Sequence, residues 1–176
     1  MPVYLFTFHA YRSWNADDRR GFVSRGKGVQ SPNQALAQAY NNSAKSRPAL
    51  FGQAAQRILL WIGYDVCQRR GWRLHYAAIE PSHVHYLVSW NDELAWQEVS
   101  RRLKNVASTM LGRKINDRKG HWFSRSGSRK RVCDRQHFEY LMEVYLPRHK
   151  GLLWREGQPP PVEPPEQKPP APAGGY

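Results

Sequence analysis

Several features that define other protein classes are scarce or missing in this chain of 176 residues. It has two cysteines, Cys67 and Cys133, and no C-x-x-C pair. This excludes a disulfide framework and argues against a structural zinc site. No apolar run approaches the roughly 20 residues that a membrane-spanning helix needs. The first residues also lack the basic and apolar regions of a secretory signal, so we expect a cytoplasmic protein without a membrane partner.

Acidic residues are scarce as well. The chain has 14 acids against 27 lysines and arginines, which gives a formal net charge of +13 and a pI near 10.1. Such an excess predicts the kind of partner rather than the fold, and it favours nucleic acid or another anionic surface. No lysine-rich helix with a wide apolar face is present, which argues against binding along a membrane surface. The length fits one domain, and 40% hydrophobic residues can supply its core.

One stretch has a different composition from the rest. Residues 157–176 include eight prolines, two acids and one lysine. Such a segment cannot hold a helix or a central strand, and we expect it to be disordered or polyproline. The sequence therefore predicts a folded domain over residues 1–156 that carries a net charge of about +14, followed by a Pro-rich tail.

Hydrophobic periodicity predicts strands and helices along this domain. The turn at residues 80–82 is short, so the strands on either side of it should form an antiparallel hairpin. Residues 11–29 are expected to form a long basic loop. The sequence is consistent both with a solvated loop and with a loop that contacts nucleic acid. The expected strands are residues 3–9, 72–79, 83–88 and part of 120–132, and the expected helices are residues 31–40, 52–70, 91–111 and 135–146.

The most distinctive short pattern is His83-Val84-His85 within an apolar run. Successive side chains of a strand point to opposite faces, so the two histidines share one face. Neutral imidazoles side by side can bind a divalent cation. Two strand histidines can also simply face solvent, and a His-x-His motif alone is weak evidence.

A tyrosine and a third histidine lie near the end of the domain. Tyr145 and His149 would be neighbours on one face if the last helix continues through them, although Pro147 would kink that helix. A phenol can attack phosphorus when it is positioned and activated. A metal ion held by His83, His85 and His149 could polarise the scissile phosphate. The alternative is that Tyr145 is an ordinary amphipathic tyrosine.

Basic residues gather in two further places. The third expected helix carries Arg101 and Lys104 off its apolar stripe. Residues 120–132 interleave aromatic residues with Arg125 and Arg129. This pattern suits single-stranded nucleic acid, where phosphates need positive charge and bases need stacking surfaces. We predict these four cations as DNA contacts, with a solvated helix face as the alternative for the first two.

Together these motifs resemble the REP-associated tyrosine transposases, which belong to the HUH single-tyrosine transposase superfamily. The His-Val-His stretch matches the family's His-hydrophobic-His motif, and Pro81-Ser82 precedes it where the family often has Pro-Asn. His-x-His alone is weak, but it is fairly specific together with an N-terminal block and a late tyrosine. The resemblance covers about residues 3–154 and includes residues 7–14, 18–23 and 71–75.

The resemblance implies an α+β fold, a ferredoxin-like antiparallel sheet backed by helices. It implies cleavage and joining of single-stranded DNA that depends on Mg²⁺ or Mn²⁺ and passes through a 5′-phosphotyrosine on Tyr145. It also implies recognition of imperfect hairpin DNA and often a homodimer. The chain departs from the family in one respect: the third ligand is commonly Asn or Gln, where this chain has His149. Tyr140 is a rival nucleophile, but Val144, four residues later, cannot bind a metal.

Two other functions stay open at this stage. The same basic fold could bind single-stranded nucleic acid without catalysis, with its histidines idle. A metal-dependent phosphodiesterase that uses water is a third reading, but no carboxylates cluster near the His-Val-His stretch to support it. Metal-dependent cleavage of hairpin DNA separates the enzyme from the binding protein, and a covalent protein–DNA adduct separates the transposase from the hydrolase.

Overall fold

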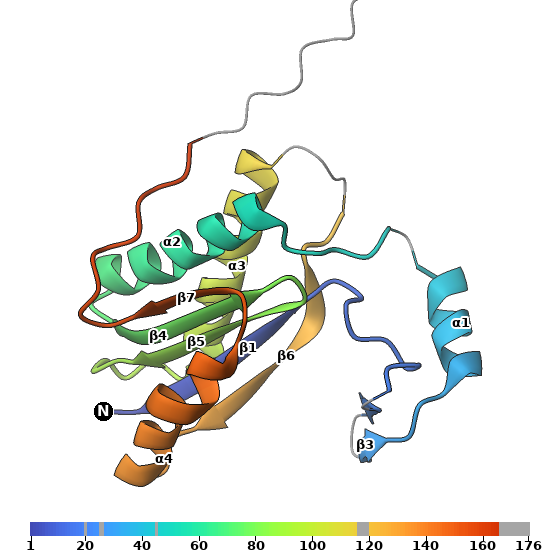
Figure 1. The fold of residues 1–176 in the computed structure, drawn as a ribbon, viewed down its shortest axis with the longest axis horizontal. Helices are drawn as coiled ribbons and strands as arrows, with labels where there is room; N and C mark the ends of the chain where they lie inside the picture. The colour runs from blue at the N-terminus through green and yellow to red at the C-terminus, as the bar shows by residue number, and fades with distance from the viewer. Residues whose placement is uncertain (20, 25–26, 45, 116–119, 166–176) are drawn as a thin grey trace, which may run out of the picture.

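A five-stranded antiparallel sheet lies between two layers of helices (Figure 1). The computed structural model describes residues 1–19, 21–24, 27–44, 46–115 and 120–165. The main sheet has the order β6-β1-β5-β4-β7, and β2 pairs with β3 in a separate small sheet. The strands are β1 (Val3–Ala10), β2 (Phe22–Ser24), β3 (Gly28–Gln30), β4 (Arg73–Glu80), β5 (His83–Ser89), β6 (Phe123–Arg131) and β7 (Leu152–Arg155). The helices are α1 (Gln34–Asn42), α2 (Gln53–Arg69), α3 (Trp96–Lys114) and α4 (Arg135–Tyr140), the last continued by a π-helix, η1 (Leu141–Tyr145), and a 3₁₀-helix, η2 (Leu146–Arg148).

Chain order and sheet order together define the fold class. Apart from β2, β3 and α1, which are inserted after β1, the chain order is β1, α2, β4, β5, α3, β6. Across the sheet, β1 and β5 lie between β6 and β4. This is the ferredoxin-like arrangement, so the expected antiparallel α+β sheet backed by helices is confirmed. β7 adds a further strand beside β4. None of the helices in the described ranges is long and apolar enough to cross a membrane.

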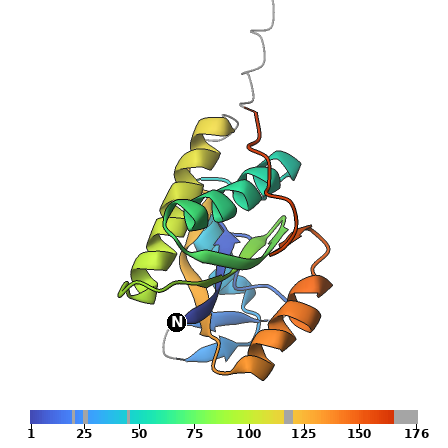
Figure 2. The same cartoon turned by 90° about the vertical axis from the view of Figure 1, so that its left-hand side faces the viewer.

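The helices α2 and α3 cover one face of the sheet, which Figure 2 shows from the side. α3 buries Leu103 and Leu111 on its apolar stripe. α2 is tied to the sheet by the Tyr86 hydroxyl of β5, which donates a hydrogen bond to the Leu59 carbonyl at 2.6 Å. Gly63 allows this close approach, because a Cβ at its position would overlap the Tyr86 ring. The main core therefore lies between these two helices and the sheet.

α4 and the turns that follow it cover part of the opposite face (Figures 1 and 2). Leu141 and Leu146 pack with Leu87 of β5 in a second, smaller core. Because the side chains of β5 alternate between the two faces, His83 and His85 lie on this same side of the sheet. The candidate site is therefore separated from α2 and α3 by the sheet itself.

Two of the expected helices begin later than the sequence pattern indicates. α1 is capped by the side chain of Asn33 rather than by Ser31. α3 begins at Trp96, because Asp92 instead folds into a turn in which its carboxylate accepts a hydrogen bond from the Leu94 backbone. Short polar side chains can cap a helix or close a turn, and the sequence alone does not decide between the two.

The first part of the Pro-rich tail, for which the sequence left disorder and polyproline open, lies against α2 and α3. Lys114 of α3 is 5% exposed. Its ammonium donates a hydrogen bond to the Pro164 carbonyl at 2.7 Å, pairs with the Glu163 carboxylate at 2.8 Å and lies 5.3 Å from the Trp61 ring centroid. Proline lacks a backbone donor but keeps its carbonyl acceptor, so such a segment can satisfy a buried cation. Residues 166–176 lie outside the described residues.

We expect truncation after Gly157 to destabilise the domain. The truncation removes the hydrogen bond and the ion pair of the Lys114 ammonium and uncovers apolar side chains of α2 such as Ile58 and Leu60. A hydrogen bond to a charged group contributes about 1.5–3 kcal/mol. Truncation after Pro165 is the matched control and should leave the free energy of unfolding unchanged. Urea denaturation of the two truncated proteins and the full chain measures the difference. Equal stability of all three would show that the contacts of residues 158–165 contribute nothing.

Candidate active site

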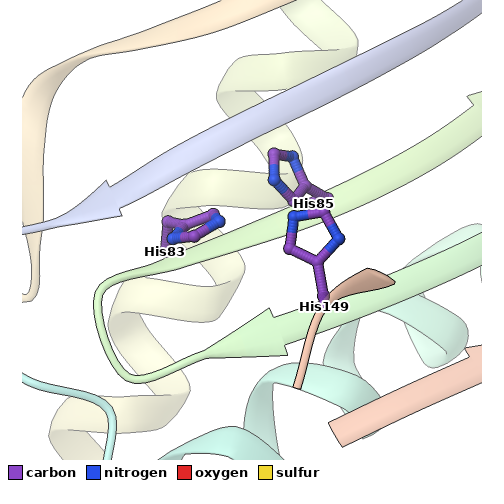
Figure 3. A group of neighbouring side chains, drawn as sticks. All are labelled: His83, His85 and His149. Carbon is purple, nitrogen blue, oxygen red and sulfur yellow. The ribbon is translucent and has the colours of Figure 1, made fainter. Parts of the chain in front are cut away.

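Three histidines from separate parts of the chain meet on the α4 side of the sheet (Figure 3). His83 and His85 come from β5, and His149 follows η2. The ring centroids lie 4.7 Å apart for His83–His85, 4.6 Å for His85–His149 and 5.6 Å for His83–His149. One nitrogen from each ring can be chosen so that all three lie within 4.8 Å of one another. The structure thus brings together the three residues that the sequence suggested as metal ligands.

Each of these histidines has a hydrogen-bond partner at its Nδ1 atom. His85 Nδ1 lies 2.7 Å from Thr7 Oγ1, and His83 Nδ1 lies 2.9 Å from Ser82 Oγ. His149 Nδ1 lies 3.0 Å from the Leu146 carbonyl oxygen. A carbonyl only accepts, so Nδ1 of His149 carries the proton and Nε2 keeps its lone pair. Partners of this kind orient metal-binding histidines, and because they occupy the three Nδ1 atoms, the three Nε2 atoms are left as candidate ligands.

The central histidine is held in its neutral form. His85 is 4% exposed. Burial, followed by the nearby His83, His149 and His9 rings, lowers the pKa of His85 to about 2. A metal ligand must be deprotonated at the binding nitrogen, so His85 is ready to bind a cation throughout the neutral pH range.

Tyr145 reaches the histidines from an irregular helix. The α-helix gives way to the π-helix η1, which ends at Tyr145, and then to the 3₁₀-helix η2, which contains Pro147. Pro147 lies at the start of η2, where its missing N–H costs little. The Tyr145 ring centroid lies 5.3 Å from that of His149 and 5.7 Å from that of His85. Tyr145 and His149 are therefore neighbours although no continuous α-helix joins them.

The environment of Tyr145 favours its neutral phenol. Burial raises the pKa of Tyr145, and the nearby Tyr140 and Glu80 add to this effect. Tyr140 itself is 46% exposed, and its ring lies 6.4 Å from the Tyr145 ring. Of the two candidate nucleophiles, Tyr145 is thus the one whose ring packs against the histidines.

The donor set fits a divalent transition-metal ion. The cluster consists of imidazoles, and the Glu80 carboxylate approaches His83 only at its outer nitrogen, with Oε2 3.9 Å from Nδ1. Mg²⁺ prefers oxygen ligands in octahedral geometry, whereas imidazole suits the first-row transition metals. Of the two ions expected from the sequence, Mn²⁺ therefore fits this set better than Mg²⁺.

The four predicted DNA contacts, Arg101, Lys104, Arg125 and Arg129, line a single groove on the α3 side of the sheet. This groove between α3 and β6 encloses about 700 Å³ and also includes aromatic residues. The Arg129 guanidinium lies 4.1 Å from the centroid of the Trp96 ring. The groove therefore combines positive charge with the half-buried rings of Tyr11 and Trp96. Trp122 and Phe123, the aromatic residues of the sequence pattern, are instead buried in the main core.

The four cations of this groove are not equivalent. Arg101 donates two hydrogen bonds to the Glu98 carboxylate, at 2.8 and 2.7 Å. The Lys104 ammonium donates to the carbonyls of Ser124 and Arg125 and so ties α3 to β6. Arg125 and Arg129 lie on β6, and both residues are exposed to solvent. We therefore regard the two β6 arginines as the stronger candidates for phosphate contacts.

Sequence reasoning missed Thr7 and Ser82, which hold the outer nitrogens of His85 and His83. Alternation along β1 could have placed Thr7 and His9 on one face of that strand. Only the register between β1 and β5, which pairs Thr7 with His85 and His9 with His83, shows that this face meets the histidine motif. These pairings join residues more than seventy positions apart, so no local pattern announces them.

The histidine triad of His83, His85 and His149 and the neighbouring Tyr145 thus lie on one face of a ferredoxin-like sheet. Residues 42–136 match the family model described as IS200-like transposase, which covers more than half of the chain, and the chain therefore belongs to this family. The search of curated proteins found no match.

Two solved structures resemble the fold at 12% sequence identity. One is a REP-associated tyrosine transposase bound to a REP hairpin, with a TM-score of 0.43. That match covers 80% of this chain, which spans 62% of the length of the other protein. The second is a candidate transposase from Deinococcus radiodurans R1, with a TM-score of 0.41 and coverage of 86% of this chain and 94% of the other. At this identity neither structure assigns a role to any residue.

We expect Thr7→Val to weaken Mn²⁺ binding by about 10- to 100-fold, the usual effect of losing a partner that orients a ligand. Valine keeps the shape of threonine and removes the hydroxyl that holds His85. Thr7→Ser keeps the hydroxyl and should bind Mn²⁺ like the original chain. Titration calorimetry measures the affinity, and nitrogen NMR shifts report the tautomer of His85. Unchanged affinity and tautomer in Thr7→Val would show that the hydroxyl does not orient the ring.

Proposed function

We propose that this chain cleaves and rejoins single-stranded DNA through a covalent bond to Tyr145. The observation that carries this proposal is the contact of the Tyr145 ring with His85 and His149, two of three histidines whose nitrogens converge. Membership of the IS200-like transposase family supports a reaction on DNA. We propose His83, His85 and His149 as the ligands of a divalent cation, with Mn²⁺ favoured by the imidazole donor set.

In the proposed cleavage step, Tyr145 Oη attacks the scissile phosphorus. An Oη–P bond forms, the bond between phosphorus and the 3′ oxygen breaks, and the phenol proton is transferred through solvent to the released 3′ oxygen. The products are a 5′-phosphotyrosine and a strand that ends in a 3′-OH. Rejoining reverses these changes when a 3′-OH attacks the phosphotyrosine, so no oxidant or external energy source is needed.

The residues of the chain prepare this reaction in three ways. Packing of Tyr145 against His85 and His149 fixes the position of the phenol. Thr7, Ser82 and the Leu146 carbonyl orient the three imidazoles. Burial raises the pKa of Tyr145 in the protein alone, and positive charge near the phenol would favour loss of its proton. A bound divalent cation would supply that charge and would neutralise the phosphate.

The target we propose is single-stranded DNA that carries a hairpin. The basic groove between α3 and β6 would bind the phosphate backbone and stack bases, while the histidines and Tyr145 act on the opposite side of the sheet. The dimeric state and the cytoplasmic location stay predictions from the sequence.

We expect Tyr145→Phe to lose strand cleavage and the covalent adduct together, because the intermediate needs the phenol oxygen. The substrate is a pool of oligonucleotides in which a fixed hairpin adjoins a randomised single-stranded segment, incubated with Mn²⁺ and examined on a denaturing gel. Tyr140→Phe is the matched control and should retain both products. Mass spectrometry of the DNA-linked peptide identifies the attached residue.

Each other outcome of this experiment favours a different function. An adduct on Tyr140 would overturn the assignment of Tyr145. Cleavage without an adduct would favour hydrolysis by water, and hairpin binding without cleavage would favour a non-catalytic DNA-binding protein. EDTA should abolish the adduct if a divalent cation is required, and addition of Mn²⁺ should restore it.

We expect the double variant Arg125→Ala, Arg129→Ala to flatten the dependence of log affinity on log salt concentration by about 1.4. Each lost phosphate contact with single-stranded DNA contributes about 0.7 to this slope. The control is Arg69→Ala with Arg70→Ala, which removes the same charge from the end of α2. Fluorescence anisotropy at several salt concentrations gives the slopes. Equal slopes for the two double variants would remove β6 from the DNA-binding surface.

A further inference from the structure

Besides Tyr145, the triad has a second group of aromatic neighbours, His9 and Trp14, next to His83. His9 of β1 lies beside His83, with ring centroids 5.8 Å apart, and Trp14 packs edge-on against His9 at 5.1 Å. Tyr145 contacts the other two histidines, His85 and His149. A row of ring contacts thus runs from Trp14 through His9 to the triad, and from the triad to Tyr145.

The fold fixes the positions of both His9 and Trp14. His9 pairs with His83 in the register of β1 and β5, which places it on the face that carries the triad. After β1 the chain turns sharply, and the Ser13 hydroxyl, with one proton to donate, lies 2.9 Å from the Ala10 carbonyl oxygen and 2.8 Å from that of Ser82. The turn leads directly to Trp14.

Trp14 is anchored at its polar edge. Its indole Nε1 donates a hydrogen bond to the Gly21 carbonyl at 2.7 Å. Gly21 has φ 84°, a conformation that favours glycine, and a Cβ at its position would overlap the Gln30 carbonyl of β3. The Trp14 side chain is half-buried. The indole is therefore held in a defined orientation at the edge of the site rather than enclosed in the core.

The stereochemistry of the proposed cleavage determines where each part of the DNA lies. In an in-line displacement at phosphorus, the attacking and leaving oxygens occupy opposite sides. If the scissile phosphate lies at the triad, attack by Tyr145 from one end of the row directs the leaving 3′ oxygen and its strand toward the other end. That end carries His9 and Trp14.

We propose that His9 and Trp14 form a binding platform for the strand released with a 3′-OH, with its terminal base stacked on the Trp14 indole. This inference rests on the proposed function of Tyr145. Aromatic side chains bind bases of single-stranded DNA by stacking. After cleavage one DNA end is covalently linked to Tyr145, whereas the other is held only by such contacts. The platform retains this second end so that rejoining can occur before it dissociates.

The test compares cleavage with rejoining in the full chain and in Trp14→Ala. Both react with the same hairpin-plus-random oligonucleotide pool, and the rejoined products and released strands are sequenced. Loss of one base–aromatic stack should reduce rejoining relative to adduct formation by roughly 5- to 150-fold. It should also weaken the base preference at the 3′ end of the released strand. The preference at the 5′ end linked to Tyr145 should stay the same.

Three further variants separate stacking from folding. Trp14→Phe keeps an aromatic ring and should retain most of the rejoining, whereas Trp14→Leu keeps apolar volume without a ring and should lose it as Trp14→Ala does. Trp61→Ala removes a half-buried tryptophan from α2, remote from the row of rings, and should keep the original ratio of rejoining to adduct. Circular dichroism gives the folded fraction of each variant.

Two results would overturn the platform, and they are distinguishable. If the full chain forms no adduct with any oligonucleotide, the proposed function fails and the platform fails with it. If the full chain forms the adduct, but Trp14→Ala or Trp14→Leu keeps the original rejoining ratio and the original base preference, the platform alone is refuted.

Discussion

The candidate site depends on the antiparallel register between β1 and β5. This register pairs Thr7 with His85 and His9 with His83, and it brings the Thr7 hydroxyl within 2.7 Å of the His85 ring. A slip of one residue would turn the side chains of one strand to the opposite face. The apolar residues on the other face, which pack against α2 and α3, oppose such a slip because it would expose them. The main core therefore holds the register that positions the histidines.

The irregular conformation of the helix that carries Tyr145 results from a separate, local constraint, the proline at position 147. Pro147 cannot donate a backbone hydrogen bond, so the chain cannot continue as a regular α-helix to His149. The structure accommodates it by passing through a π-turn and a 3₁₀-turn, and Leu141 and Leu146 anchor these turns in the smaller core. The carbonyl of Leu146 then accepts a hydrogen bond from His149. The irregular helix thus orients Tyr145 and His149 toward the same point.

Binding and chemistry occupy opposite faces of the sheet in the proposed function. The groove between α3 and β6 lies on the side of the main core, whereas the triad lies under α4. A DNA strand that contacts both the groove and the triad must pass around the edge of the sheet. Tyr11 and His121 line the groove, and their rings pack together at 5.6 Å near the end of β1 that carries His9. The basic groove is distant from the proposed site of phosphate cleavage. It can therefore contribute a salt-dependent affinity for DNA without altering the chemical step.

The sequence by itself determined the elements whose evidence is local. Alternation placed His83 and His85 on one face, and helical spacing located α2. The four basic residues that the sequence singled out line one groove, which only the tertiary structure shows. The motifs together indicated the family. The sequence left the outcome of the break at Pro147 open, missed Thr7 as the partner of His85, and placed the start of α3 too early. It left disorder and polyproline open for the tail and gave no sign that Pro164 accepts a hydrogen bond from Lys114. Each of these depends on contacts between distant residues, such as the 78 positions that separate Thr7 from His85. Periodicity and composition report only a residue's neighbours along the chain, so register, the packing of the irregular helix and the burial of a charge were decided by the tertiary structure alone.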